Sequence, residues 1–246
     1  MNDPKVAAAV ADVESRYGKG AVMHADGGPV ADVPVIRTGF APLDEVLCVG
    51  GWARGRVHEL TGDTGGGKST IAILSCVQAQ REGLTAAIVD FAHNLDVGVL
   101  VSLGVDPTKL LVSQPDSGEQ GMEIALSLVK SGAVDLVVID LGEGLVSQAE
   151  IEGEDWGHSG LAARLLSQTL RKLTAACSRS NAVTLFVDRP GTTGNALKFY
   201  ATTRTQVMID GDAPELRWCK VLKNKLAPPF KSTLPFDLSS LAKVTP

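Results

Sequence analysis

The chain has no run of eighteen or so apolar residues, no basic-then-apolar segment at its amino terminus, no internal repeat and no low-complexity tract. We therefore expect neither a membrane-spanning helix nor an export signal. Cysteine is scarce as well, and the four cysteines lie far apart without a Cys-x-x-Cys pair: Cys48, Cys76, Cys177 and Cys219. This spacing indicates neither a zinc site nor a disulfide framework, so a cytoplasmic protein is expected.

A surplus of basic charge is also missing, since 23 Lys and Arg residues face 28 Asp and Glu residues and leave a net charge of -5. An acidic chain argues against a broadly basic nucleic-acid surface, although a local basic groove remains compatible with it. The content of 44% hydrophobic and 21% charged residues is that of a globular protein, and 246 residues suit one large domain with small appendages.

An amino-terminal arm is predicted before the main core. Asp3 and Pro4 are favourable N-cap and first-turn residues, and the alanine-rich run 6–17 is amphipathic. A Gly-, Pro- and Asp-rich stretch, ADGGPVADVP, follows this run. We expect residues 1–33 to form a helical arm with its linker and residues 34–246 to form the core.

Within the core, strand-like apolar runs alternate with helical periods. The strand-like runs, several of them apolar on both faces, are RVHEL, TAAIVDF, LLVSQ, DLVVID, AVTLFVD and TQVMI. Helical periods cover residues 68–81, 117–130 and 161–178, with Ser117 and Gln120 in capping-box positions. This alternation predicts an α/β fold in which a mostly parallel central sheet carries helices on both faces.

The stretch GDTGGGKST contains the pattern G-x-x-x-x-G-K-[ST] between the strand RVHEL and a helical run, which is the context of a phosphate-binding loop. Lys68 would neutralise phosphate charge and Ser69 would offer its hydroxyl to magnesium. Asp140, which ends the strand DLVVID, would hold the magnesium shell through water. The predicted metal residues are Ser69 and Asp140, and the predicted phosphate-binding residues are Gly62, Asp63, Thr64, Gly65, Gly66, Gly67, Lys68, Ser69 and Thr70.

Segments spread in order over nearly the whole chain resemble the bacterial recombinase RecA family: SRYGKGAVM, VIRTGFAPLD, GGWARGRVHELTG, LLVSQPDSGEQ, SGAVDLVVID, EIEGE, ARLLSQTLRKL, NALKFYA and KNKLAPPF. The resemblance implies a RecA core fold, ATP with Mg²⁺ at a site shared between adjacent protomers, and a role near DNA recombination and repair. It also implies that the arm, residues 1–33, packs on a neighbouring subunit. The family's carboxyl-terminal domain has no counterpart after FDLSSLAKVTP.

The nucleotide site departs from the family pattern. In IVDFAHNLD, Ala92 stands where the family has the glutamate that activates the attacking water, so hydrolysis should be slow or absent. Glu143 would be a displaced substitute base. Asp96 keeps its place as a nucleotide-binding residue, whereas Val99 replaces the family's adenine-stacking tyrosine. Arg189 replaces the glutamine that senses the terminal phosphate.

Both segments that resemble the family's DNA-binding loops are altered. The second loop is much shorter, and in the first, EIEGEDWGHSG, Ser159 takes the place of the wedge residue. Trp156 either stacks on a base or shields the base of this loop from water. Arg164 and Arg171 match residues near the DNA axis, although arginines seven apart also form an ordinary exposed helix face. Weak, salt-dependent binding of single-stranded DNA by Trp156, Arg164 and Arg171 is expected.

Residues that match the family's subunit interface remain. Lys223 and Lys225 in KNKLAPPF match lysines that reach the neighbour's ATP. Lys198 and Phe199 in ALKFYA match the face that inserts into the adjacent subunit. Alone, a Lys-x-Lys on a strand is usually a solvated face and a lone Phe is usually core. Together, in family order, they predict docking to a RecA-type recombinase or to a second copy of this chain.

Three interpretations compete. A working recombinase, a DNA-dependent ATPase that forms filaments on single-stranded DNA, conflicts with Ala92, Ser159 and the shortened second loop. An unrelated P-loop module, such as a signalling ATPase, conflicts with the ordered family segments. We favour a regulatory paralogue of the DNA-damage (SOS) response that binds ATP, hydrolyses it weakly or not at all, and joins or caps RecA filaments. In outline it resembles accessory proteins of the ImuA type, which act with a translesion polymerase partner; no membrane contact is expected.

Overall fold

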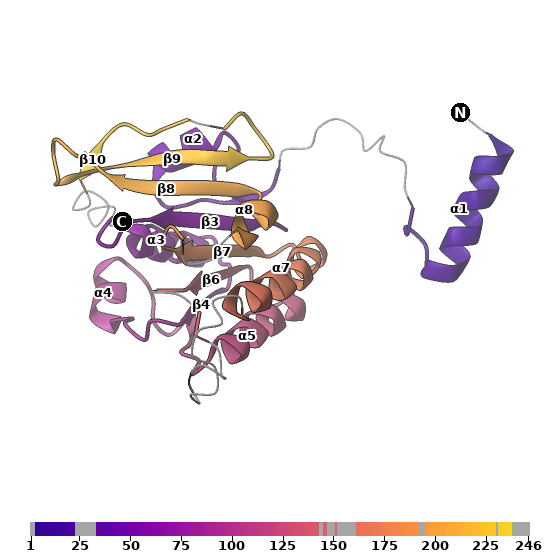
Figure 1. Ribbon diagram of the computed structural model, residues 1–246, viewed down its shortest axis with the longest axis horizontal. Coiled ribbons are helices and arrows are strands. Elements are labelled where there is room, and N and C mark those ends of the chain that lie inside the picture. Colours follow the sequence, from indigo (N-terminus) through magenta and orange to yellow (C-terminus); the bar gives the residue numbers. More distant parts are fainter. Residues whose placement is uncertain are drawn as a thin grey trace. The chain divides into compact units, whose positions relative to one another are not determined.

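The computed structural model places the chain in two compact units, Met1–Asp32 and Val33–Pro246, each of which is described by itself (Figure 1). The structure describes residues 3–22, 33–142, 145–146, 151, 161–191, 195–229 and 231–237.

The first unit is the helix α1, Pro4–Tyr17. The Asp3 side chain caps its amino terminus by accepting a hydrogen bond from the Lys5 N–H at 2.9 Å, and Gly18 follows at φ 95°. A hollow of about 310 Å³ runs along one apolar side, lined by Lys5, Val6, Ala9, Val10, Val13 and Val22. The helix predicted from the alanine-rich run is confirmed, and its apolar side is open within this unit.

A central sheet organises the second unit (Figure 1). Its strands are ordered β10-β9-β8-β3-β7-β6-β4-β5, parallel from β8 to β5 and antiparallel at β8-β9-β10. The mostly parallel sheet predicted from the sequence is confirmed. The bounds are β3 Val57–Gly62, β4 Ala86–Asp90, β5 Leu110–Ser113, β6 Leu136–Asp140, β7 Val183–Asp188, β8 Thr203–Ile209, β9 Leu216–Asn224 and β10 Phe236–Asp237.

Helices cover both faces of this sheet, as predicted, and each face has its own apolar core. Leu60 and Leu185 lie in the core that α3 covers, whereas Val137 and Phe186 lie in the core under α5 and α7. The helices are α2 Ala41–Leu47, α3 Lys68–Arg81, α4 Val97–Ser102, α5 Gly118–Ser131, α7 Leu161–Ser180 and α8 Ala196–Tyr200. A small antiparallel pair, β1 Val35–Ile36 and β2 Trp52–Ala53, lies outside the main sheet.

The central strands are buried on both faces, which explains their continuous apolar sequence. All residues of β3, β4 and β7 are buried. By contrast, Leu111 and Val112 of the edge strand β5 are each 48% exposed. Among the residues that the structure describes, no helix is both long enough and apolar enough to cross a membrane.

The capping box predicted at the start of α5 is present in altered form. Ser117 accepts a hydrogen bond from the Gln120 N–H at 3.3 Å, as expected of an N-cap. The Gln120 side chain, however, accepts from the Asp116 N–H at 2.8 Å and so secures the residue before the cap. The N-cap is thus the predicted Ser117, and only the return bond from Gln120 goes to the residue before the cap.

Candidate nucleotide site

The glycine-rich loop joins β3 to α3 at the middle of the sheet. A Cβ added to Gly62, at φ 150°, would lie 2.2 Å from the Val207 carbonyl oxygen, so this close approach requires glycine. Gly65 and Gly67 have φ angles of 75° and 95°. Gly67 caps α3 without a side chain, so no side chain of the cap competes with an anion for the first-turn N–H groups.

Lys68 already lies over this loop. Its Nζ donates a hydrogen bond to the Asp63 carbonyl oxygen at 2.9 Å. Partial burial lowers the pKa of Lys68, while the negative charges of Asp140 and Asp188 act in the opposite direction. The ammonium group is therefore held near the place where phosphate oxygens would meet the loop, on a carbonyl that it can exchange for them.

Ser69 and Asp140 join α3 to the end of β6. The Ser69 Oγ donates to Asp140 Oδ2 at 3.0 Å. Burial raises the pKa of Asp140, against the hydrogen bonds that the carboxylate accepts from the Gly142 N–H and from Ser69. A hydroxyl and a carboxylate side by side are the hard oxygen ligands that Mg²⁺ prefers, so the residues present fit a magnesium–nucleotide complex. Their assignment as metal residues stays a prediction.

The carboxyl end of β4 is held differently. The buried Asp90 carboxylate accepts from the Ala92 N–H at 3.0 Å, the Leu95 N–H at 3.1 Å and the Gln114 Nε2 at 3.0 Å. These bonds fix the loop that carries Ala92 beside the loop after β6, where a Cβ added to Gly142 would lie 2.7 Å from the Ala92 Cβ. The methyl group of Ala92 therefore occupies the position at which the family's water-activating glutamate is expected.

The helix α4 presents the residues predicted to meet the nucleotide base. Asp96 caps this helix, since its Oδ1 accepts from the Val99 N–H at 2.9 Å. Val99 is 50% exposed, and Val97 and Val101 are exposed on the same helix. The structure thus places Asp96 and Val99 together at an open surface, and a role of either residue in nucleotide binding stays a prediction.

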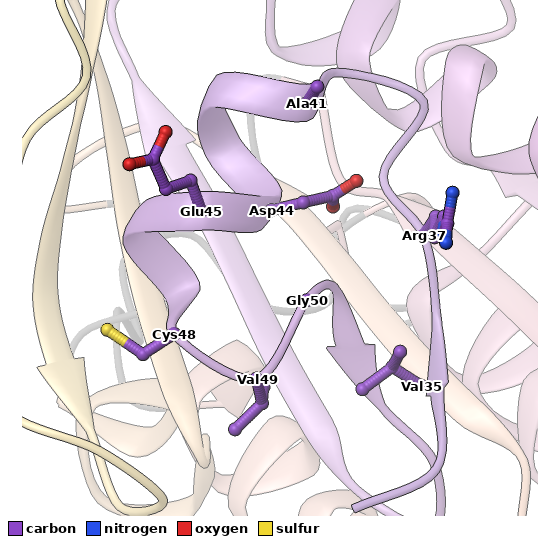
Figure 2. Close-up of a pocket in the computed structure, with 8 residues that line it drawn as sticks. All are labelled: Val35, Arg37, Ala41, Asp44, Glu45, Cys48, Val49 and Gly50. Atoms are coloured by element: carbon purple, nitrogen blue, oxygen red, sulfur yellow. The ribbon is translucent and has the colours of Figure 1, made fainter.

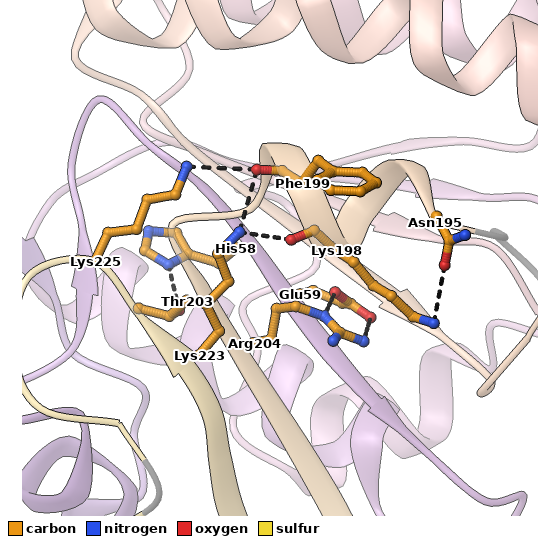
Figure 3. Close-up of polar contacts among 9 residues, drawn as sticks. All are labelled: His58, Glu59, Asn195, Lys198, Phe199, Thr203, Arg204, Lys223 and Lys225. Carbon is orange, nitrogen blue, oxygen red and sulfur yellow. Dashed lines mark hydrogen bonds and ion pairs between the residues drawn. The ribbon is translucent and has the colours of Figure 1, made fainter.

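The four predicted interface residues lie together around α8 and β9 (Figure 3). The Lys223 Nζ donates to the carbonyl oxygens of Lys198 at 2.6 Å and Phe199 at 3.1 Å, and the Lys225 Nζ donates to the Phe199 carbonyl at 3.4 Å. The Phe199 side chain is 73% exposed. Partial burial lowers the pKa of Lys223, and the charges of Lys225 and Arg204 act in the same direction. Contacts of these lysines with a neighbour's ATP stay a prediction.

Sequence reasoning missed two polar contacts that support β3 (Figure 3). Glu59 and Arg204 form a mostly buried ion pair between β3 and β8, with Arg204 Nη2 and Glu59 Oε1 at 2.9 Å. The buried His58 ring hydrogen-bonds Thr203 Oγ1 at 2.7 Å and the Ala53 carbonyl at 2.9 Å. The sequence could not predict these contacts, because His58 and Thr203 lie 145 positions apart, as do Glu59 and Arg204.

The predicted DNA-binding residues are only partly described. Trp156 and Ser159 lie outside the residues that the structure describes, as does Glu143, the predicted substitute base. Arg164 and Arg171 are both exposed on α7, two turns apart and therefore on one side of the helix. DNA contact by these arginines stays a prediction.

A separate hollow of about 610 Å³ lies beside α2 and contains no residue of the predicted site (Figure 2). Asp44 faces it and accepts from the Thr38 N–H at 2.9 Å, and burial raises the pKa of that carboxyl group. The residues around it are Val35, Arg37, Ala41, Asp44, Glu45, Cys48, Val49 and Gly50.

Comparison with known proteins agrees with this geometry. The family model described as the RecA N-terminal domain matches residues 4–239. "Protein RecA" of Desulforapulum autotrophicum is 45% identical over 258 residues, which cover 96% of this chain and 74% of that protein. "Protein RecA" of Francisella tularensis subsp. novicida is 46% identical over 247 residues, which cover 91% of this chain and 68% of that protein.

A solved structure shares the fold. The crystal structure of the RadB recombinase superposes with a TM-score of 0.65 at 21% sequence identity, and the match covers 82% of this chain and 96% of that chain. At this identity the likeness concerns the arrangement of the sheet and its helices alone.

Proposed function

The chain belongs to the RecA family, and from that premise we propose that it is a cytoplasmic, RecA-like ATP-binding protein of DNA repair and recombination. Within that role it acts as a regulatory paralogue: it docks on a RecA-type recombinase, modulates or inhibits its filaments, and hydrolyses ATP weakly or not at all. More specifically, we propose that it acts in the SOS response together with a translesion polymerase, as accessory proteins of the ImuA type do.

Nucleotide binding is supported by the groups that gather around the glycine-rich loop. The Gly65 and Gly67 backbone, the Lys68 ammonium group and the Ser69 hydroxyl surround one loop. Asp140 lies 3.0 Å from that hydroxyl. A bound Mg²⁺ would neutralise charge on the β- and γ-phosphates, and Ser69 and Asp140 would hold it.

Weak hydrolysis rests on one observation, the methyl group of Ala92 at the end of β4. The nearby carboxylate cannot replace a missing base, because Asp90 is buried and its two oxygens accept three hydrogen bonds. Loss of a positioned general base commonly lowers a rate 10²–10⁴-fold. The expected result is a protein that holds ATP without rapid turnover.

Docking is supported by what the surface retains. Phe199 exposes 73% of its side chain next to Lys223 and Lys225. α1 keeps an open apolar side in its own unit. Because filament growth requires each protomer to offer one face and accept another, a protomer with one defective side would stop elongation at few copies per filament.

The test titrates this protein into a RecA strand-exchange or filament-assembly assay. Inhibition at substoichiometric protein is expected, and Phe199→Ala or deletion of residues 1–20 should abolish it. Leu234→Ala is the matched control, since it removes another exposed apolar side chain, 83% exposed, outside α8. No effect at equimolar protein, together with no co-purification with RecA or a translesion polymerase component, would contradict the regulatory role.

The alternative is a working DNA-dependent ATPase that forms filaments on single-stranded DNA. The retained Lys223 on β9 and Lys225 just after it, which donate to carbonyl oxygens of α8, favour it. A DNA-stimulated ATPase assay separates the two functions, because brisk turnover would establish the alternative and exclude the regulatory paralogue.

Single-stranded DNA is expected to bind weakly, through Arg164 and Arg171 on the exposed side of α7 and through Trp156. Arg164→Ala and Arg171→Ala each remove one phosphate-binding side chain and should each reduce the salt dependence of log K by about 0.7. Fluorescence anisotropy at several salt concentrations measures this slope. Tight binding at physiological salt that neither substitution changes would contradict it.

A further inference from the structure

One arginine connects the β8–β9 hairpin to the phosphate loop. Arg217, the second residue of β9, donates from Nη1 to the carbonyl oxygens of Pro214 and Leu216 within its own hairpin. From Nη2 it donates to the carbonyl oxygen of Gly65 at 3.3 Å. The guanidinium group therefore ties the loop to a segment 152 residues further along the chain.

The hairpin is built to hold this group in place. Val207 of β8 is paired with Gly62 at the end of β3, so the turn of the hairpin lies at the same end of the sheet as the loop (Figure 1). Asp210 shapes that turn, because its Oδ1 accepts from the Asp212 N–H at 3.0 Å and the Ala213 N–H at 3.3 Å. Its own N–H donates to the Leu216 carbonyl at 3.0 Å.

The peptide between Gly65 and Gly66 is held at both of its polar ends. The Gly66 N–H donates to the Asp63 carbonyl at 3.1 Å, and the Gly65 carbonyl of the same peptide accepts from Arg217. Three consecutive glycines, Gly65 to Gly67, give this loop unusual backbone freedom, and a peptide between two glycines rotates easily. An external contact that fixes the peptide removes part of that freedom.

Arg217 also carries an unmatched polar atom. Its Nε is buried and has no hydrogen-bond partner among the described residues. A buried donor without an acceptor costs about 1–3 kcal/mol, and such groups in native structures call for an explanation. The burial of this donor shows that the guanidinium group is held beside the loop and not turned freely into water.

We propose that Arg217 is a positioning residue of the nucleotide site. From outside the loop it fixes the Gly65–Gly66 peptide and so keeps a three-glycine phosphate loop in one conformation, with a positive charge beside the bound polyphosphate. The chemistry that it serves is the diphosphate group shared by nucleoside di- and triphosphates. The inference deepens the proposed function, because it rests on the nucleotide binding proposed above.

The test measures the dissociation constants of MgADP and MgATP by calorimetry for the full chain. Arg217→Met should raise both about tenfold, and Arg217→Lys, which keeps the charge, should recover a large part of this loss. The matched control is Lys220→Met on the same strand, which removes a positive charge from a residue paired with Gln206 and Ser232. This control should bind like the unaltered chain, and all variants should keep its melting temperature without nucleotide.

A second variant and a second measurement cover the case in which Arg217→Met does not fold. Asp210→Ala loosens the hairpin turn and should raise the same constants by a smaller factor. Hydrogen exchange of the nucleotide-free, unaltered chain should show the Gly66 amide protected, and exchange as fast as in an unstructured peptide would overturn the proposal. Unchanged affinity in a folded Arg217→Met would also overturn it. An unaltered chain that binds neither nucleotide refutes the proposed function itself. The exchange measurement then still decides on Arg217, because the Gly66 amide should exchange faster in Arg217→Lys than in the unaltered chain, and equal rates would overturn the proposal.

Discussion

The carboxyl ends of β3 and β4 lie at the same edge of one sheet but differ in what they can do. After β3, the glycine loop, Lys68 and Ser69 bring together the groups predicted to bind phosphate. After β4, the loop is held as firmly by Asp90, yet the residue that it positions is Ala92. The loop after β4 is therefore well held, and the residue at the predicted base position has no ionisable group.

This difference leads us to expect that binding and hydrolysis are separable in this chain. The carboxylate that shapes the β4 loop is not the residue that would activate water, so the loop survives the loss of a base without losing its conformation. A protein in which only the second edge has changed would still sense ATP. Four measurements test whether the two edges are as independent as the structure indicates.

The largest effect is expected from Lys68→Ala at the β3 edge. Removal of the ammonium group takes away charge-assisted hydrogen bonds to phosphate and should weaken MgATP binding on the order of 100-fold. Calorimetry measures this, with Lys130→Ala, an exposed lysine near the end of α5, as the control. Unchanged affinity would show that the β3 edge does not hold the nucleotide.

The pH dependence of stability tests the hydrogen bonds of His58, which support the strand β3. The Ala53 carbonyl can only accept, so it receives a hydrogen bond from His58 Nε2, and Thr203 donates to Nδ1 of the neutral ring. Burial lowers the pKa of His58 from 6.5 to about 4. Above pH 6.5 the ring is neutral in both the folded and unfolded chain, and between pH 6.5 and 4 only the unfolded chain takes up the proton.

Stability contributed by the neutral ring is therefore present above pH 6.5 and is lost as the pH falls toward 4. From pH 7 to pH 5 this loss amounts to about 2 kcal/mol of unfolding free energy. Denaturant unfolding of the unaltered chain and of His58→Gln measures it, because the variant should lack this part of the pH dependence. Parallel pH curves for the two proteins would rule it out.

Ala92→Glu restores a carboxylate at the position where the family has its water-activating glutamate. A carboxylate at this position should raise the slow hydrolysis rate about tenfold, less than a general base contributes in a complete site. The gain is limited because Gly142 packs closely against this position. Ala92→Gln, of the same size but without a base, is the control. No increase would show that other departures, such as Arg189, also prevent turnover.

The smallest effect is expected at the base-binding surface of α4. Val99→Tyr adds an aromatic face at a position that is 50% exposed and should tighten MgATP binding a few-fold. Val101→Tyr, 52% exposed on the same helix, is the control. Equal effects of both substitutions would indicate nonspecific apolar contact.

Local patterns predicted the parts of the fold that depend on local physics. The helix 68–81 agrees in both bounds with α3, because the phosphate-loop motif fixes its start and apolar periodicity sustains it. The six predicted strands correspond to β3 to β8, and in β3, β4 and β7 burial on both faces leaves a continuous apolar signal. The strand β9, Leu216–Asn224, was missed, since its half-buried residues mix charged and apolar letters.

The site was predictable only where a motif spans it. The pairing of Ser69 with Asp140 follows from the motif and from a strand that ends in a carboxylate. The contact of Arg217 with Gly65 could not be predicted, because nothing near either residue marks a partner 152 positions away. Lys223 and Lys225 were identified by the family resemblance. Their hydrogen bonds to carbonyl oxygens of α8 could not be predicted from the sequence, because they depend on the packing of α8 against β9.

Those carbonyls put a condition on assembly. Lys223 cannot reach a neighbour's phosphate while its Nζ is bonded to Lys198 and Phe199, so the two destinations compete for one ammonium group. Whatever draws Lys223 away removes two of the hydrogen bonds at the end of α8 and leaves the one from Lys225 to the Phe199 carbonyl. If the predicted contact with a neighbour's ATP forms, nucleotide in one protomer would therefore weaken the support under Phe199 in the next.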